Sequence, residues 1–143
     1  FEYERAQTLI DIYEPTKLIL GKASKINSIN AELARINEEN FNNLQIMNSG
    51  SDTFEFSCIN LEETIHTVKD QISVYRNDYN IVIAPMNNKL SSLAIGLVAI
   101  EDSTVQVCYA STNQYNINGY SSPSDYIFHI DLNLFFAISK YNL

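Results

Sequence analysis

The chain contains 143 residues, of which 45% are hydrophobic and 18% charged, and its formal net charge is -8. This length suffices for one domain with a sizeable core and is short for two. We therefore expect a single domain over residues 1–143. Because the first residue is Phe1 and not Met, we also expect that this domain could be a fragment of a longer protein.

The composition and the pattern of apolar residues argue against two classes of partner, nucleic acid and membranes. The nine Lys and Arg residues are spread along the chain and do not form the basic cluster that generic nucleic-acid binding requires. No apolar run approaches the roughly 18–20 residues of a membrane span, and no signal peptide is visible. We expect a cytoplasmic protein that binds neither nucleic acid in general nor a membrane.

The two cysteines, Cys58 and Cys108, lie in separate apolar runs typical of strands. The chain has no CxxC pair and no Cys/His cluster, so we expect no structural zinc site and no cofactor. Free cysteine is often buried. Two reduced, buried thiols are the simplest interpretation.

Helix and strand patterns alternate in the first half of the chain. The predicted helices cover residues 2–13, 24–41 and 61–75, and the predicted strands cover 16–21 and 53–59. The segment 16–21 could instead open one long helix to Asn40, but Gly21 favours a strand because glycine costs a helix about 1 kcal/mol.

The helix over 24–41 is predicted from four apolar residues spaced 3, 4 and 3 apart, which would form its buried face: Ile26, Ile29, Leu33 and Ile36. Residues 37–43 are rich in Asn and Glu and indicate a frayed end and a loop. Residues 44–47 could be a short extended piece.

The segment from Tyr79 to Tyr109 is the strongest structural pattern in the chain. Ile81–Ala84 is a β-branched run typical of a strand buried on both faces, and Pro85 ends it. A polar turn, an apolar helix over 90–100 and a strand over 105–109 follow. This order predicts a βαβ unit with parallel strands and a right-handed crossover.

The last third of the chain is more polar. Residues 111–125 form a long loop that carries Tyr115 and Tyr120, followed by an alternating strand over 126–130 and a short helix over 132–141. The last strand could add antiparallel at an edge. The whole order predicts a Rossmann-like α/β fold, with a mostly parallel sheet and helices on both faces.

The turn between the strand ending at Ala84 and its helix is the first candidate ligand site. Ligands bind outside the carboxyl ends of parallel strands, and helix amino termini favour anions. Lys89 could supply a positive charge, and the polar side chains of Asn87, Asn88, Ser91 and Ser92 could donate hydrogen bonds. The alternative is an ordinary loop in which Asn88 or Ser91 caps the helix and Lys89 is solvated.

A second candidate lies after the first strand, where Gly21, Lys22 and Ser24 would form a loop. In a doubly wound sheet this loop and the Asn87 turn could face one crevice. We also expect the loop over 111–125 to fold over the same edge, with Tyr115 or Tyr120 able to stack on a planar ligand. The patterns of a P-loop and of GxGxxG are absent.

Two segments resemble a known family. The run 83–94, followed by Val105–Tyr109, looks like the last motif of CRISPR-associated Rossmann-fold sensor domains, and residues 18–24 are similar to that family's first strand and ligand loop. The resemblance implies binding of a cyclic oligonucleotide second messenger across a homodimer. The sequence departs from the family pattern at Asn87 and Asn88, which replace a glycine pair, and it lacks the threonine before the lysine.

These observations favour a non-catalytic domain that senses a nucleotide-like anion, as a homodimer or through contacts with other domains of a longer chain. One alternative is a small enzyme that acts on a nucleotide or phosphate ester, with Lys89 as an electrostatic stabiliser. The other is a protein–protein interaction module without a small ligand. No nucleophile and base can be paired from the sequence.

Overall fold

The computed structural model describes residues 3–110 and 129–133. The chain divides into two compact units, Phe1–Ser111 and Thr112–Leu143. Of the predicted elements, the loop over 111–125 with Tyr115, the strand over 126–130 and the helix over 132–141 lie wholly or mostly outside the described residues. The rest of the fold concerns the first unit.

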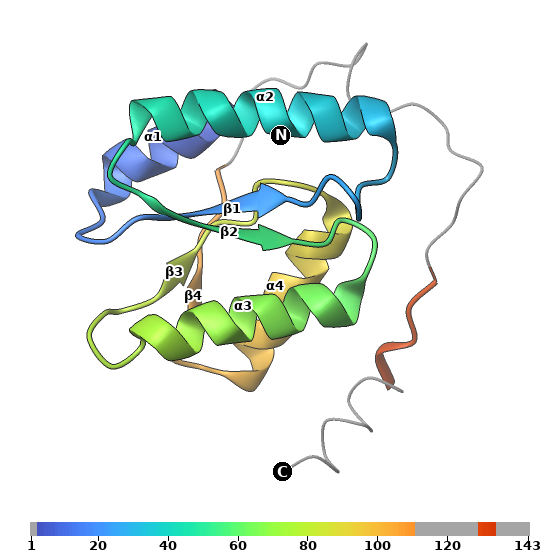
Figure 1. Ribbon diagram of the computed structural model, residues 1–143. Coiled ribbons are helices and arrows are strands. Elements are labelled where there is room, and N and C mark those ends of the chain that lie inside the picture. The colour runs from blue at the N-terminus through green and yellow to red at the C-terminus, as the bar shows by residue number, and fades with distance from the viewer. Residues whose placement is uncertain (1–2, 111–128, 134–143) are drawn as a thin grey trace. The chain divides into compact units, whose positions relative to one another are not determined.

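Helices and strands alternate along the first unit, as the sequence predicts (Figure 1). The elements are α1 (Tyr3–Tyr13), β1 (Ile19–Ala23), α2 (Ala31–Met47), β2 (Asp52–Phe56), α3 (Leu61–Tyr75), β3 (Val82–Ile83), α4 (Lys89–Glu101) and β4 (Gln106–Val107).

The strands form two separate pairs, and both pairs are parallel. β1 pairs with β2 in the register that sets Ile19 opposite Asp52, and β3 pairs with β4 in the register that sets Val82 opposite Gln106. The predicted parallel βαβ unit is therefore confirmed. β1 and β3 are not hydrogen-bonded neighbours, so the described strands do not form one continuous sheet.

Two helices lie on each side of the β1–β2 pair (Figure 1). α1 contacts α2 on one side, and α3 contacts α4 on the other. Apolar residues of α1, β1 and α2 form a buried cluster, which consists of Ala6, Leu20, Phe41 and Leu44. The largest fully buried side chains among the described residues include those of Leu97 and Val98, both on α4.

The observed α2 corrects two predictions. The helix begins at Ala31, because the side chain of Asn30 accepts a hydrogen bond from the Leu33 amide and caps the helix. It then continues to Met47, through residues predicted as a loop and an extended piece. Its buried residues are Phe41 and Leu44, whereas Ile26 is 91% exposed. The predicted start and the predicted buried face are therefore wrong.

The first strand is confirmed, and the alternative of one long helix is excluded. However, Gly21 and Lys22 lie within β1 and not in a loop after it. Glycine suits this position because a Cβ atom there would lie 3.0 Å from Cζ of Phe54 on the neighbouring strand. Gly21 thus allows close packing between strands, and it does not end the strand.

The second strand pair is less buried than the sequence predicts. Val82 is 39% exposed and Val107 is 45% exposed, although we expected both strands to be largely buried. Among the described residues, each of these strands has one neighbouring strand and one edge without a neighbour. The prediction assumed a full sheet around them, and the described residues do not supply it.

Candidate ligand site at the carboxyl edge

Three turns follow the carboxyl ends of β1, β2 and β3, and they meet on one side of the first unit. We call this side the carboxyl edge; it comprises residues 24–30, 57–60 and 84–88. The Cys58 amide donates to the carbonyl of Asn27, at 2.9 Å, and Nδ2 of Asn88 donates to the carbonyl of Cys58, also at 2.9 Å. The turn after β2 therefore joins the other two.

Asn88 and Ser91 form a reciprocal cap at the start of α4. Oδ1 of Asn88 accepts from the Ser91 amide at 2.8 Å, and Oγ of Ser91 accepts from the Asn88 amide at 3.2 Å. Ser91 is buried. These hydrogen bonds match the capping alternative for both residues, and a ligand contact by either one stays a prediction.

Lys89 is the first residue of α4, and its side chain is exposed. Within the described part of the chain it makes no ion pair, and no acidic residue occupies the first turn of α4. The backbone amides of Lys89 and Leu90 likewise have no partner among the described residues, as is usual in the first turn of a helix. Lys89 and these amides are thus available to a negatively charged group.

Asn87 lies at the same edge and links two elements. Its Oδ1 accepts from the Cys58 thiol at 3.6 Å, and its Nδ2 lies 3.5 Å from Oδ1 of Asn37 on α2. Burial raises the pKa of the Cys58 thiol. The thiol therefore stays protonated near neutral pH and is a poor nucleophile.

Of the predicted second site, Gly21 lines the same cavity as Asn87, whereas Lys22, Ser24 and Lys89 are not among the residues that line it. Nζ of Lys22 lies 3.5 Å from Oε1 of Glu38 and 5.7 Å from the centre of the Phe41 ring, so α2 engages this lysine. The Ser24 amide donates to the carbonyl of Phe56. Lys22 thus stabilises the contact between β1 and α2.

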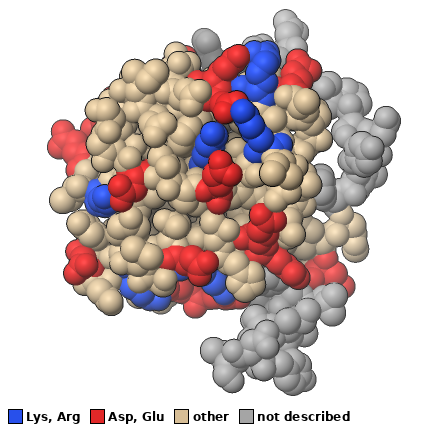
Figure 2. All heavy atoms as spheres, viewed as in Figure 1, with Lys and Arg blue, Asp and Glu red and all other residues tan. Residues whose placement is uncertain are grey.

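Lys25 is a further lysine of this edge, and it is also paired. Its Nζ lies 2.6 Å from Oε2 of Glu38, and this hydrogen bond lowers the pKa of that carboxyl group. Figure 2 shows the same mixture of signs, with basic side chains close to acidic ones on the face in view. Lys89 differs from Lys22 and Lys25 because it has no acidic partner among the described residues.

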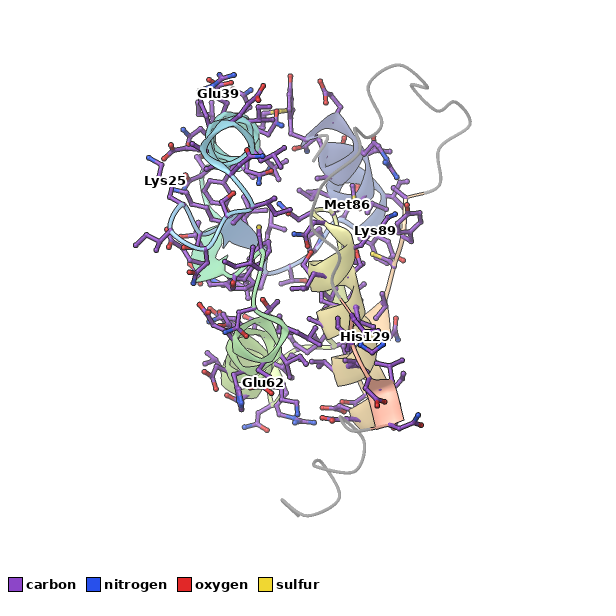
Figure 3. All side chains as sticks on the ribbon, turned by 90° about the vertical axis from the view of Figure 1, so that its right-hand side faces the viewer. Lys25, Glu39, Glu62, Met86, Lys89 and His129 are labelled. Atoms are coloured by element: carbon purple, nitrogen blue, oxygen red, sulfur yellow. The ribbon has the colours of Figure 1, made fainter. Side chains whose placement is uncertain are left out.

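Figure 3 views the first unit from the side of the carboxyl edge, with Lys25 on the left and Met86 and Lys89 on the right. Sequence reasoning missed Asn27, a residue of this edge, and Asn37 of α2, whose Oδ1 lies 3.5 Å from Nδ2 of Asn87. Asn27 lies in a segment predicted as helix, and its Nδ2 donates to Oε1 of Glu63 at 3.0 Å. Its position after a strand was the signal that could have identified it.

Two kinds of feature are absent from the described residues. No helix among them is long and apolar enough to cross a membrane, and no group of three His, Cys, Asp or Glu residues among them could hold a metal ion.

No protein-family model and no curated protein matches the chain.

Proposed function

We propose that this chain is a ligand-sensing, non-catalytic domain of Rossmann-like type that binds a nucleotide-like anion at the carboxyl edge. The observation that carries the proposal is Lys89. It is an exposed lysine without an acidic partner among the described residues, and it lies beside free amides at the start of α4, where a parallel strand ends.

The net charge of the whole chain is unfavourable for an anionic ligand at Lys89. The net charge of -8 repels anions at long range, so binding has to come from short-range contacts. A lysine and two amides that point at one phosphate supply such contacts. The half-buried Asn87 side chain, next to Asn37 of α2, could hydrogen-bond another polar group of the same ligand.

A homodimer is part of the proposal. The resemblance in residues 83–94 implies that two copies of the chain share one messenger. The exposed Lys89 of each copy, at the carboxyl edge, could contact one half of such a symmetric ligand. The enzyme alternative has no specific observation in its favour among the described residues, and burial raises the pKa of the thiol at this edge, that of Cys58.

The test is isothermal titration of the whole chain with AMP, cyclic AMP, cyclic di-AMP and inorganic phosphate. We expect at least one nucleotide to bind, and Lys89→Ala to weaken that binding about tenfold, which corresponds to the roughly 1.4 kcal/mol of one charged hydrogen bond. Lys25→Ala is the matched control, since Lys25 lies at the same edge but is paired with Glu38. The control should leave the affinity unchanged.

Equal weakening by both variants would show a nonspecific charge effect and contradict the role of Lys89. Binding of none of the four compounds would remove this ligand class from the proposal. Circular dichroism of both variants confirms that each is folded, so that loss of binding is not loss of structure.

A further inference from the structure

The two strand pairs face each other with open edges. In the β1–β2 register, the Asp52 amide donates to the carbonyl of Leu18 and the Ser24 amide donates to the carbonyl of Phe56. Since alternate residues of a strand point to opposite neighbours, the backbone groups of Ile19, Gly21 and Ala23 face away from β2. They have no hydrogen-bond partner among the described residues.

The same reasoning applies to β3. The amides of Gln106 and Cys108 donate to the carbonyls of Ile81, just before β3, and of Ile83 in β3, so the backbone carbonyls of these two residues point toward β4. The backbone groups of Val82 therefore point away from β4, and the described residues offer them no partner. Unpaired backbone groups at an edge attract another strand.

A cavity of about 650 Å³ separates the two open edges. Gly21 of β1 and Val82 of β3 both line it. Apolar side chains of the helix layers also line it, Leu9 and Ile10 from α1 and Val68 and Ile72 from α3. This space has two walls that can hydrogen-bond and two that are apolar, as the position of a buried strand does.

The size of the cavity also fits one strand. Five residues of extended chain span about 16 Å, neighbouring strands lie about 4.8 Å apart, and packed layers lie about 10 Å apart. Together these dimensions define a slab of roughly 800 Å³, which is of the same order as the cavity.

The position of α1 indicates how such a strand would connect to β1. Its first turn lies at the carboxyl end of β4, where the guanidinium of Arg5 lies 5.8 Å from the centre of the Tyr109 ring and donates to the carbonyl of Ala110. α1 then runs back and leads into β1 (Figure 1). A helix that starts at the carboxyl edge and feeds a parallel strand is the crossover of a βαβ unit.

We propose that the space between β1 and β3 is the position of a fifth parallel β-strand, supplied by polypeptide that leads directly into α1. The complete sheet would have the order β2-β1-new strand-β3-β4. With the new strand counted first along the chain, this is the doubly wound order 3-2-1-4-5. α1 and α2 on one side, and α3 and α4 on the other, are the helix layers that right-handed crossovers produce for this order.

The inference does not rest on the ligand proposal, but it has a consequence for that site. In a doubly wound sheet the ligand crevice lies where the strand order reverses, which is between the new strand and β3. The turn that carries Asn87 and Lys89 follows β3. The fifth strand would therefore end beside this turn.

The test compares residues 1–143 with two extended proteins. One carries Val-Ile-Val-Ile-Val and a four-residue Gly/Ser loop before Phe1; the other carries Val-Pro-Val-Pro-Val and the same loop. Proline has no amide to donate to a ladder, so the second extension is as long and as apolar but lacks two of its five amides and cannot form a complete ladder on both sides. Amide hydrogen exchange is followed by NMR at Gly21 and Val82.

The first extension should slow exchange at both amides by about 100-fold or more, because strand amides exchange only on opening, and the proline extension should not. The Ser24 amide, already bonded to Phe56, should be protected in all three proteins. Equal exchange at Gly21 and Val82 in both extended proteins would overturn the proposal. So would full protection of these amides in the unextended chain, which would show that β1 and β3 pair directly or that a second copy fills the space.

Discussion

At the residue scale, Asn88 does more than cap α4. Its Oδ1 accepts from the Ser91 amide, while its Nδ2 donates to the carbonyl of Cys58 and so connects two turns. We expect Asn88→Ala to lower the free energy of unfolding by about 1–3 kcal/mol, from the lost cap and the lost hydrogen bond. Asn88→Asp keeps the acceptor and loses only the donor, so it should cost less. Urea denaturation measures both, and equal losses would show that the Cys58 contact carries all the effect.

Asp52 provides a pH-dependent contribution at the opposite ends of the strands. Lys17 lies 2.5 Å from its Oδ2, and the hydroxyl of Tyr75 donates to the same oxygen at 2.9 Å. The hydrogen bond from Lys17, and then that from Tyr75, lower the pKa of Asp52 below its ordinary value of 3.8. Because the folded pKa is depressed, the stabilisation is present above the unfolded pKa and is lost as pH falls through the folded value.

We therefore expect the melting temperature of the natural chain to fall more steeply than that of Asp52→Asn as the pH drops below about 4. The control is Asp70→Asn, because the Asp70 carboxylate has no ion pair among the described residues. Its melting temperature should follow that of the natural chain. Thermal denaturation across this pH range is the measurement, and parallel curves for Asp52→Asn and the natural chain would contradict the assignment.

At the element scale, α2 shows what apolar spacing can and cannot predict. The pattern of Ile26, Ile29 and Leu33 suggested a buried face, but each of these three residues is exposed. Asn30 interrupts the pattern because its side chain accepts a hydrogen bond from the Leu33 amide and so caps the helix. The helix therefore begins after Asn30, and Ile26 and Ile29 lie before it. A sequence so rich in asparagine offers many possible caps, and only the packing of Phe41 and Leu44 against α1 and β1 selects one.

This difference predicts the cost of two substitutions. Leu44→Ala should lower the free energy of unfolding by about 2–5 kcal/mol, since Leu44 is buried in the cluster with Ala6 and Phe41. Ile26→Ala should change it by less than about 0.5 kcal/mol, because the side chain is exposed. Chemical denaturation of both variants tests the observed position of α2. A large loss for Ile26→Ala would restore the predicted buried face.

The βαβ unit around Lys89 was predictable because its signals are local. A β-branched run that ends at Pro85, a polar turn and an apolar helix each follow from a few neighbouring residues. The contacts that join the turns were not predictable in this way. The bond from Asn88 to Cys58 and the engagement of Lys22 by Glu38 depend on which elements pack together, and residue spacing does not reveal that.

At the scale of the whole first unit, the main discrepancy is the exposure of β3. Its sequence is typical of a strand buried on both faces, and Val82 is nevertheless 39% exposed. A fifth strand would explain this exposure. It also predicts that the loss in unfolding free energy caused by Ile83→Ala depends on whether a strand is added before Phe1. The loss of stability should be larger in the protein that carries Val-Ile-Val-Ile-Val than in residues 1–143, because Ile83 becomes buried there. If urea denaturation gives the same loss of stability for Ile83→Ala in both proteins, the added strand does not enter the sheet.

The central claim is that the carboxyl edge binds a nucleotide-like anion through the start of α4. The most direct measurement is an NMR titration of the isotope-labelled chain with cyclic di-AMP and, separately, AMP. The claim predicts that the largest saturable amide shifts occur at Asn87, Lys89 and Leu90, and that Lys89→Ala moves the midpoint of these shifts to about tenfold higher ligand concentration. Saturable shifts confined to other parts of the chain, or none with either nucleotide, would contradict it.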